Sequence, residues 1–218
     1  MKLALFDLDH TLIPFDSGMA WTRFLVARGV LPADAETVYL GYCQQYVDGT
    51  LDIRELHRAS VAPLAAFGMA QLRQWAEEFE AEVAPRVPDQ MRALVKKHQD
   101  AGHLCAIVTA TTRFIAEPFG RVFGVADVLA TRSRVVDDTP DGGIDGDPCF
   151  GVHKLMHVNQ WLALHDTRLD ALERSWFYSD STSDLPLLEA VSDPVAVAPD
   201  ERLRAHALQA GWPILERS

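Results

Sequence analysis

The stretch that decides the predicted fold is Leu3-Ala4-Leu5-Phe6-Asp7-Leu8-Asp9-His10-Thr11, an apolar run that ends in two carboxylates one residue apart. The run 3–6 predicts a buried strand, from which Asp7 and Asp9 would point to the same side. Like charges that close raise one pKa unless a cation compensates them. Open α/β sheets bind ligands beyond the carboxyl ends of their strands. We interpret the pair as metal-bound and catalytic; on this stretch alone, a solvated turn is an equally good alternative.

Composition narrows the class of protein. A chain of 218 residues suits a large α/β domain, or a core domain with a smaller appendage. The three cysteines, Cys43, Cys105 and Cys149, are too few and too scattered for a disulfide framework or a Cys-based zinc site. Without a signal segment or an apolar run of about 18 residues, we expect a cytoplasmic protein that does not cross a membrane. The net charge of −11 argues against binding nucleic acid, although local cations can still bind a small anion.

Alternating apolar and amphipathic segments predict a parallel sheet. Strand-like runs lie at 3–6, 104–108, 128–129, 176–178 and 195–197, with helical patterns between most of them. The gap between the first two runs is too long for one crossover helix. It contains amphipathic stretches at 19–28, 33–47, 53–64 and 70–84. We therefore predict a core of residues 1–15 and 87–218, and an all-helical cap of residues 16–86.

Three local features refine this organisation. Pro85 and Pro88 mark the return from the insertion to the core. Asp89 is expected to cap a helix that runs to about residue 101. The segment 137–143, which is rich in Asp and Gly, predicts a hairpin turn between short strands.

Further polar residues follow two of the later strands. Thr109-Ala110-Thr111-Thr112 comes after the second strand, where hydroxyls and free N–H groups can hold phosphate oxygens. Taken in isolation, the stretch favours an ordinary Thr N-cap. Asp180 and Asp184 follow the fourth strand in a loop of small residues. Two Asp-rich loops at one sheet edge, with hard oxygen ligands, suit Mg²⁺.

One lysine is needed to balance these charges. A carboxylate about 4 Å from a phosphate oxygen is repelled by several kcal/mol per charge pair, so Lys154 is a candidate phosphate ligand; a surface lysine is the alternative. His153 and His157 share a helix face but lack a third zinc ligand, and we interpret them as solvated. No glycine-rich phosphate loop supports a nucleotide cofactor.

In order along the chain, Asp7-Leu8-Asp9-His10-Thr11, Thr109, Lys154 and Asp180-x-x-x-Asp184 resemble the four motifs of the haloacid dehalogenase-like (HAD) phosphohydrolases. The resemblance covers essentially the whole chain. The helical insertion looks like the cap of the phosphoserine-phosphatase-like branch. The resemblance implies an α/β fold with a Rossmann-like parallel core and a cap that closes over the active site.

The resemblance also implies roles for individual residues. Asp7 would be the nucleophile that forms an aspartyl-phosphate, and Asp9 the general acid and base. Thr109, Ala110 and Lys154 would bind the phosphoryl group. Mg²⁺ would be held by the carboxylates of Asp7 and Asp180 and the backbone carbonyl of Asp9, with Asp184 supporting.

The substrate is less constrained. Asp16 falls where phosphoserine phosphatases carry an acidic residue for the substrate amine, and Arg58 near their arginine for the substrate carboxylate; a solvated helix face is the simpler explanation of Arg58. Thr109-Ala110-Thr111 replaces the Ser-Gly-Gly typical of that branch, and Ser183 an Asn. The second motif looks more like a bacterial subgroup that includes histidinol-phosphate phosphatases. Candidate aromatic residues for the cap surface are Phe15, Trp21 and Tyr46, although such residues are usually core.

These features predict a Mg²⁺-dependent phosphomonoesterase for a small amino-alcohol phosphate, such as phosphoserine or histidinol phosphate. Two alternatives stay open: a phosphotransferase to a small alcohol, and a non-catalytic protein that binds phosphorylated metabolites. The sequence does not indicate the oligomeric state.

Overall fold

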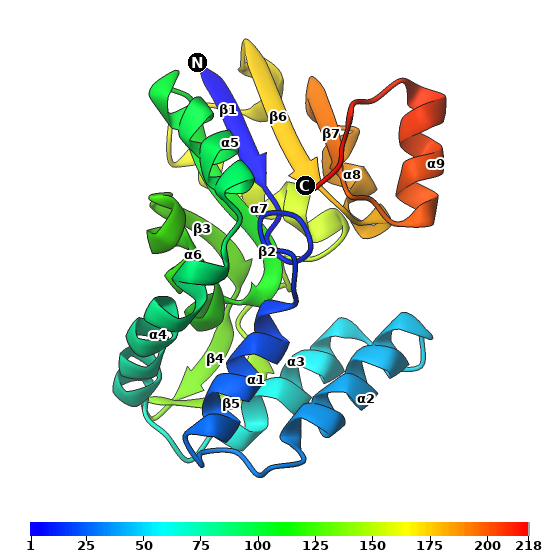
Figure 1. The fold of residues 1–218 in the computed structure, drawn as a ribbon. Helices are drawn as coiled ribbons and strands as arrows, with labels where there is room; N and C mark the ends of the chain where they lie inside the picture. Colours follow the sequence, from blue (N-terminus) through cyan, green and yellow to red (C-terminus); the bar gives the residue numbers. More distant parts are fainter. Residues whose placement is uncertain (218) are drawn as a thin grey trace.

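The computed structural model describes residues 1–217 as a parallel six-stranded sheet with helices on both faces and a helical insertion at one edge (Figure 1). The strand order is β3-β2-β1-β6-β7-β8, so β1 lies centrally and the chain passes first to one side of it and later to the other. The strands are β1 (Lys2–Phe6), β2 (Leu104–Thr112), β3 (Asp127–Thr131), β6 (Arg174–Ser179), β7 (Asp193–Val197) and β8 (Ile214–Leu215). This confirms the predicted α/β class with a parallel core.

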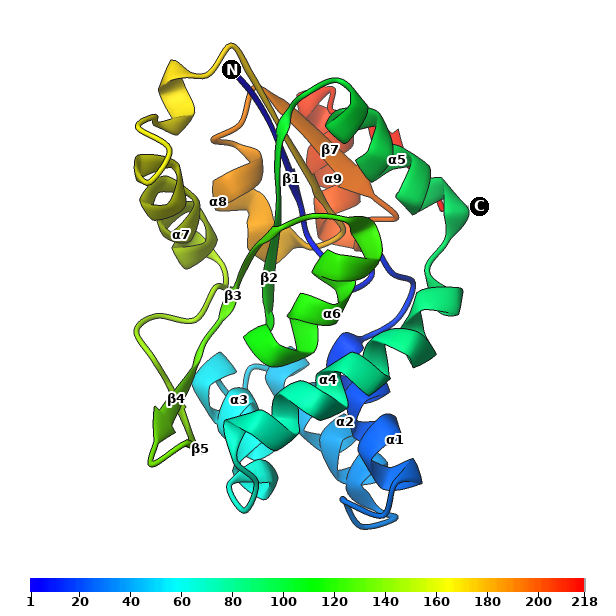
Figure 2. The ribbon, with the colours of Figure 1, turned by 90° about the vertical axis from the view of Figure 1, so that its left-hand side faces the viewer.

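Alternation along β1 divides the hydrophobic core into two layers. Leu3 and Leu5 pack into one buried cluster, which includes residues of α7 (Val152–Ala163), α8 (Leu185–Leu188) and α9 (Glu201–Ala210). Ala4 and Phe6 pack into the other cluster, which includes residues of α5 (Asp89–Asp100) and α6 (Arg113–Phe123). Figure 2 shows α5 and α7 on opposite sides of the sheet. A strand buried on both faces is hydrophobic throughout, which explains the apolar run at 3–6.

The insertion between β1 and β2 is helical and lies beyond the carboxyl ends of the strands (Figure 1). Two of its helices end in short 3₁₀ turns, Ala62–Leu64 and Ala84–Arg86. Each turn contains a proline, Pro63 or Pro85, which cannot donate the next helical hydrogen bond. The four helices are α1 (Ser17–Ala27), α2 (Ala35–Val47), α3 (Ile53–Val61) and α4 (Met69–Val83).

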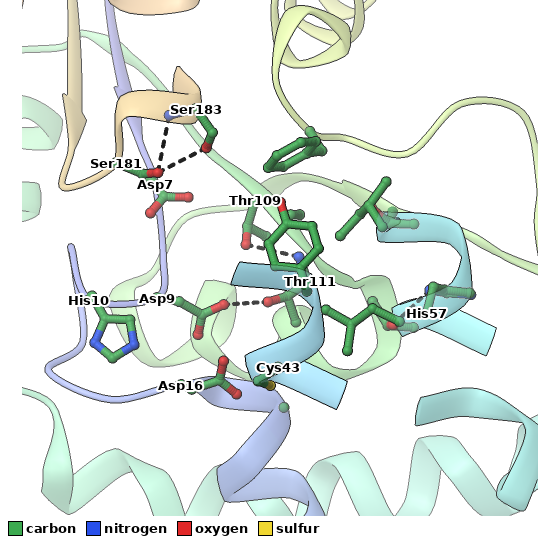
Figure 3. Close-up of a pocket in the computed structure, with 18 of the residues that line it drawn as sticks. Asp7, Asp9, His10, Asp16, Cys43, His57, Thr109, Thr111, Ser181 and Ser183 are labelled. Carbon is green, nitrogen blue, oxygen red and sulfur yellow. Dashed lines mark hydrogen bonds between the residues drawn. The ribbon is translucent and has the colours of Figure 1, made fainter. Parts of the chain in front are cut away.

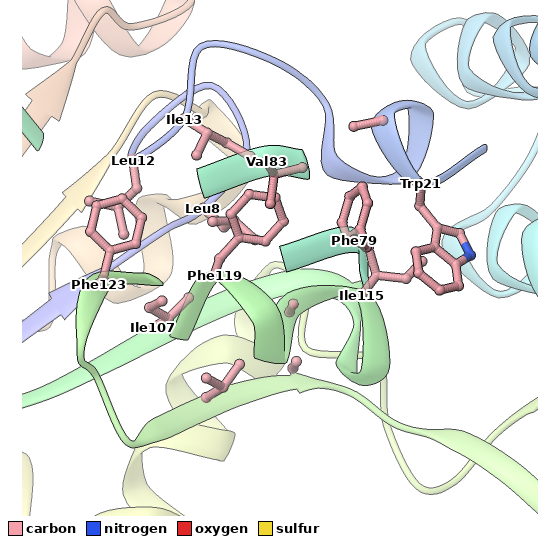
Figure 4. Close-up of a cluster of buried hydrophobic side chains, with 14 of the residues drawn as sticks. Leu8, Leu12, Ile13, Trp21, Phe79, Val83, Ile107, Ile115, Phe119 and Phe123 are labelled. Carbon is pink, nitrogen blue, oxygen red and sulfur yellow. The ribbon is translucent and has the colours of Figure 1, made fainter. Parts of the chain in front are cut away.

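The hydrophobic core continues from the sheet into the base of this insertion. Trp21 of α1 and Phe79 of α4 contact each other edge to face, with ring centroids 5.2 Å apart, and Phe79 also contacts Phe119 of α6 (Figure 4). By contrast, α2 buries none of its residues. The division into a core domain (1–15, 87–218) and a cap (16–86) stays a proposal. The aromatic contacts pack α1 and α4 of the insertion against α6.

Several element bounds differ from the prediction. Strand β2 runs to Thr112 rather than ending at 108, with a register shift against β3 between Thr109 and Thr112. The hairpin of β4 (Ser133–Val136) and β5 (Thr139–Ile144) turns at only two residues, Asp137 and Asp138, both with positive φ. This tight turn leaves the remainder of the predicted turn, 139–143, in a strand.

Two helix starts were also predicted wrongly. Asp89 is the first residue of α5 and its side chain makes no cap hydrogen bond, because the preceding Pro88 already provides the extended backbone of the cap position. The sequence pattern after Pro186 predicts a helix over 187–191, but α8 begins at Leu185, with Pro186 in its first turn.

Cys43, Cys105 and Cys149 are all free thiols. None of the helices within residues 1–217 combines the length and the apolar character that a bilayer-spanning segment needs.

Candidate active site

A cavity of about 470 Å³ lies between the carboxyl edge of the sheet and the insertion (Figure 3). It brings together residues from all four sequence motifs, which lie up to 177 positions apart as Asp7 and Asp184. The predicted site residues that line it are Asp7, Asp9, Asp16, Thr109, Ala110, Lys154, Asp180 and Asp184. Because parallel strands end at one edge, the convergence follows from the topology.

Lys154 forms the centre of a buried ion network. Its Nζ donates to Oδ1 of Asp7 and to Oδ2 of Asp184, each at 2.7 Å, and its side chain is only 3% exposed. Burial would lower the pKa of Lys154, but Asp184 and Asp7 raise it well above its usual range. Lys154 therefore stays charged inside the cavity, as the charge balance of the sequence required.

Thr11 connects the first motif to the last. Its hydroxyl oxygen lies 3.0 Å from Oδ2 of Asp7 and 3.0 Å from Oδ1 of Asp180, and it accepts the backbone N–H of Asp180. A hydroxyl carries one proton and can donate to only one of these carboxylates at a time. One carboxylate oxygen of the pair is therefore always left without a donor from Thr11.

The carboxylates at this edge carry more negative charge than their protein partners neutralise. Burial and the charge of Asp7 raise the pKa of Asp180 to about 8, and burial also raises the pKa of Asp184. Oδ1 of Asp184 is buried without a hydrogen-bond partner. Carboxylate oxygens that lack donors fit a hard divalent cation.

The cation would not be enclosed by side chains alone. Across residues 1–217, no three Asp, Glu, His or Cys side chains converge as a ready-made metal cage. The residues fit Mg²⁺ in particular, because this ion commonly takes one or two carboxylates and completes its shell with water and substrate phosphate.

Asp9 is held by two donors. Its Oδ1 accepts the backbone N–H of Ser17 at 2.6 Å. Its Oδ2 accepts the hydroxyl of Thr111 at 2.5 Å (Figure 3). Burial raises the pKa of Asp9 to about 7, and the charge of Asp16 adds to the effect. A carboxyl group that titrates near neutrality can serve as either acid or base.

A register shift in β2 shapes the part of the cavity lined by Thr109 and Ala110. Ala110 and Thr111 pair with no residue of β3, because the ladder passes directly from Thr109 to Thr112. The Thr109 hydroxyl oxygen accepts the N–H of Thr111 at 3.2 Å, so its own proton is free to be donated. Ala110 and Thr109 line the cavity beside the carboxylates.

The insertion contributes an acidic group and an apolar wall. Oδ1 of Asp16 accepts the hydroxyl of Tyr39 at 2.9 Å and the N–H of Met19, which caps α1. Tyr46 of α2 meets Phe150 of the core edge to face, with ring centroids 5.8 Å apart. The wall around them is completed by Cys43, Val47, Ile53 and Leu56.

Some candidate residues lie elsewhere. Arg58 is exposed and does not line the cavity; its stem lies beside Gly142 of β5, because its position on α3 faces the hairpin. Phe15 packs on Phe119, and Trp21 is 3% exposed in the core, so only Tyr46 of the three aromatic candidates lines the cavity.

Ser17 and Tyr39 were missed by the sequence interpretation. Ser17 follows Asp16 at the start of a helix, where serine is common, so nothing in the sequence marked it out. Tyr39 had a usable signal. It shares one helix face with Cys43 and Tyr46, at spacings of four and three residues.

Comparisons with known proteins show the family to which the chain belongs. Residues 4–189 match the model of the haloacid dehalogenase-like hydrolases. The chain belongs to this family. A histidinol-phosphatase of Neisseria meningitidis serogroup C is 38% identical over 217 residues, which are 98% of each chain. The predicted family is therefore confirmed.

Two solved structures resemble the fold. A protein of unknown function from Bordetella pertussis Tohama I is 40% identical, with a TM-score of 0.92 over 98% of this chain and 97% of that one. A substrate-bound phosphoserine phosphatase is 16% identical, with a TM-score of 0.70 over 99% of this chain and 93% of that one. The second likeness concerns the fold alone.

Proposed function

We propose that this HAD hydrolase is a phosphomonoesterase that works through an aspartyl-phosphate on Asp7. The observation that carries the proposal is the environment of Asp7, which lies at the cavity with one oxygen on Lys154 and the other on Thr11. A carboxylate that met an anionic phosphate without such cations and donors would repel it. With them, it is a nucleophile held in a fixed orientation.

In the first step, a carboxylate oxygen of Asp7 forms a bond to phosphorus while the bond from phosphorus to the leaving oxygen breaks. Asp9 gives its proton to that leaving oxygen, so the alcohol departs neutral. In the second step, water attacks phosphorus and gives a proton to Asp9. The bond between phosphorus and Asp7 then breaks, which releases phosphate and restores both carboxyl groups.

The phosphoryl oxygens would be held by Lys154, the Thr109 hydroxyl and the backbone of Ala110. Lys154 is fixed between Asp7 and Asp184, so its charge is already oriented before substrate binds. Preoriented donors of this kind stabilise the charge that spreads over the phosphoryl oxygens during transfer.

Mg²⁺ would be held by the carboxylates of Asp7 and Asp180 and the backbone carbonyl of Asp9, with Asp184 supporting. When bound, the ion would supply positive charge that lets a phosphate dianion approach the Asp7 side chain. Two observations support this assignment. The carboxylates of Asp7 and Asp180 share the single hydroxyl proton of Thr11, and Oδ1 of Asp184 has no hydrogen-bond partner.

We propose a small amino-alcohol phosphate as substrate, and favour histidinol phosphate over phosphoserine. Asp16 offers a carboxylate to an amine, whereas no arginine within residues 1–217 lines the cavity to meet a substrate carboxylate. The apolar wall near Tyr46 and Phe150 suits an aromatic ring. The relationship to the Neisseria histidinol-phosphatase supports the same choice.

The test is phosphate release by the purified chain from histidinol phosphate, phosphoserine and a simple aryl phosphate, with Mg²⁺ or with EDTA. We expect turnover that needs the metal, prefers histidinol phosphate and is lost in Asp7→Asn. Full activity in Asp7→Asn or in EDTA would refute the mechanism. Transfer of phosphate to added alcohols would indicate a phosphotransferase, and tight binding without turnover would indicate a binding protein.

A further inference from the structure

The Asp9 carboxylate is anchored by two parts of the chain that are far apart in sequence. Ser17, the first residue of α1, donates its N–H to Oδ1. Thr111, one of the two residues of β2 between Thr109 and Thr112 that have no partner in β3, donates its hydroxyl to Oδ2. The final torsion of an aspartate is broad, so one anchor alone would leave the plane of the carboxylate loosely defined. Two donors on two different oxygens fix that plane.

The second anchor is itself part of a hydroxyl pair. The Ser17 hydroxyl is fully buried, and its oxygen lies 3.0 Å from that of Thr111, with either atom able to donate. Because hydroxyls both donate and accept, this pair can reverse its direction. When Asp9 is ionised, Ser17 donates to Thr111 and Thr111 donates to Asp9. When Asp9 carries a proton on Oδ2, Asp9 donates to Thr111 and Thr111 donates to Ser17.

We propose that Thr111, supported by Ser17, is the positioning residue that holds Asp9 for both of its proton transfers. The inference rests on the proposed function. As the phosphorus–oxygen bond of the substrate breaks, the proton leaves Oδ2 for the departing oxygen, and the Thr111 hydroxyl turns from acceptor to donor. When water later gives a proton to Asp9, the hydroxyl pair turns back. A side chain without a hydrogen-bonding group at position 111, such as valine, could serve neither state.

If Thr111 had only a structural role, as a contact between α1 and β2, its loss would lower kcat/KM equally for all substrates. If it positions Asp9, its loss would lower kcat/KM mainly for substrates whose leaving oxygen needs a proton. Aryl phosphates release a stable phenolate-type anion and need little proton donation, whereas alkyl phosphates need it fully. The comparison uses kcat/KM, because this constant reports the steps up to departure of the leaving group.

The experiment compares Thr111→Val, which removes the hydroxyl and keeps the shape, with Thr111→Ser, which keeps the hydroxyl. The matched control is Thr112→Val, since the Thr112 hydroxyl lies 3.2 Å from Nδ1 of His57 and does not contact Asp9. kcat/KM is measured for one alkyl and one aryl phosphate. A thermal unfolding curve for each variant confirms that it is folded.

Because general acid catalysis contributes about 10²- to 10⁴-fold, we expect Thr111→Val to lower kcat/KM for the alkyl phosphate by about 10- to 100-fold and for the aryl phosphate by under about 3-fold. Thr111→Ser should restore most of the loss, and Thr112→Val should affect both substrates alike. Equal losses on both substrates in Thr111→Val, or no rescue by Thr111→Ser, would overturn the inference alone. A wild-type chain without any phosphomonoesterase activity would overturn the proposed function as well.

Discussion

Nζ of Lys154 lies 2.7 Å from Oδ1 of Asp7, and both side chains are buried at the carboxyl edge of the sheet. The two residues are far apart in sequence: Asp7 directly follows β1, and Lys154 lies in the first turn of α7. The pair therefore joins the proposed nucleophile to the proposed phosphate ligand before any substrate is present. Its energetics and its chemistry can be tested together.

Lys154→Met should cost both activity and stability. Loss of one preoriented cation is expected to lower kcat by about 10²- to 10³-fold. Leaving Asp7 and Asp184 without their common partner is expected to lower the free energy of unfolding by about 3–5 kcal/mol. Urea unfolding and steady-state kinetics measure the two effects.

The control is Lys96→Met, which removes an exposed ion pair with Asp100 at 2.8 Å and should cost under about 1 kcal/mol. A Lys154→Met variant as stable and active as this control would show that the buried network is not required.

Asp16→Asn should change substrate preference. A hydrogen bond to a charged group contributes about 1.5–3 kcal/mol, so kcat/KM for an amine-bearing phosphate should fall by about 10- to 100-fold. An aryl phosphate without an amine should be hydrolysed nearly as before. Asp48→Asn, on an exposed residue at the end of α2, is the control. A similar loss on both substrates would refute recognition of the amine by Asp16.

Gly18→Ala should act through Tyr39. A Cβ at Gly18 would lie 2.2 Å from the Tyr39 hydroxyl oxygen and must push it away from Asp16. Because Tyr39→Phe removes the same hydrogen bond, we expect both variants to raise KM for the amine-bearing substrate by about 3- to 10-fold, without additivity in the double variant. Gly41→Ala, on the same helical insertion with open space around it, should leave KM unchanged. Additive effects would contradict the shared contact.

The loss of folding stability at acid pH should depend on His57. Burial lowers the pKa of this side chain from 6.5 to about 4. The unfolded chain therefore binds the proton first, and the stability contributed by neutral His57 is present above pH 6.5 and is lost as the pH falls toward 4. The loss should reach about 3 kcal/mol at most.

Urea unfolding at pH 4.5 and pH 7 measures this effect. The difference between the two pH values should shrink in His57→Gln and stay unchanged in the exposed His165→Gln. An unchanged difference in His57→Gln would mean that another group controls the acid response.

The layout of the sheet and most of the cavity were predictable from the sequence. The runs that became β1, β2 and β6 are apolar, and parallel strands end at one edge, so Asp7, Thr109 and Asp180 had to lie near one another. The position of Lys154 could be inferred only from charge balance and family resemblance, since a lysine at a helix start is ordinary.

Tertiary packing decided the features that the sequence did not reveal. Arg58 could have faced the cavity or the hairpin, and only the packing of α3 on β5 places it at Gly142. Helix α2 has an amphipathic pattern, yet its apolar side borders the cavity at Tyr46 instead of the core. The register shift at Thr109 depends on pairing with β3, which no local pattern specifies.

The most direct test of the account is to look for the phosphoryl group on Asp7. The Asp9→Asn variant is mixed with an aryl phosphate and Mg²⁺ and then quenched in acid. The protein is digested, and the masses of its peptides are measured by mass spectrometry. The aryl substrate needs little proton donation, while loss of the base at position 9 slows hydrolysis of the intermediate. We predict a burst of one phenol per enzyme and one phosphoryl group on the Asp7 peptide. Steady release of phenol with Asp7 unmodified, or a phosphoryl group on another residue, would contradict the account.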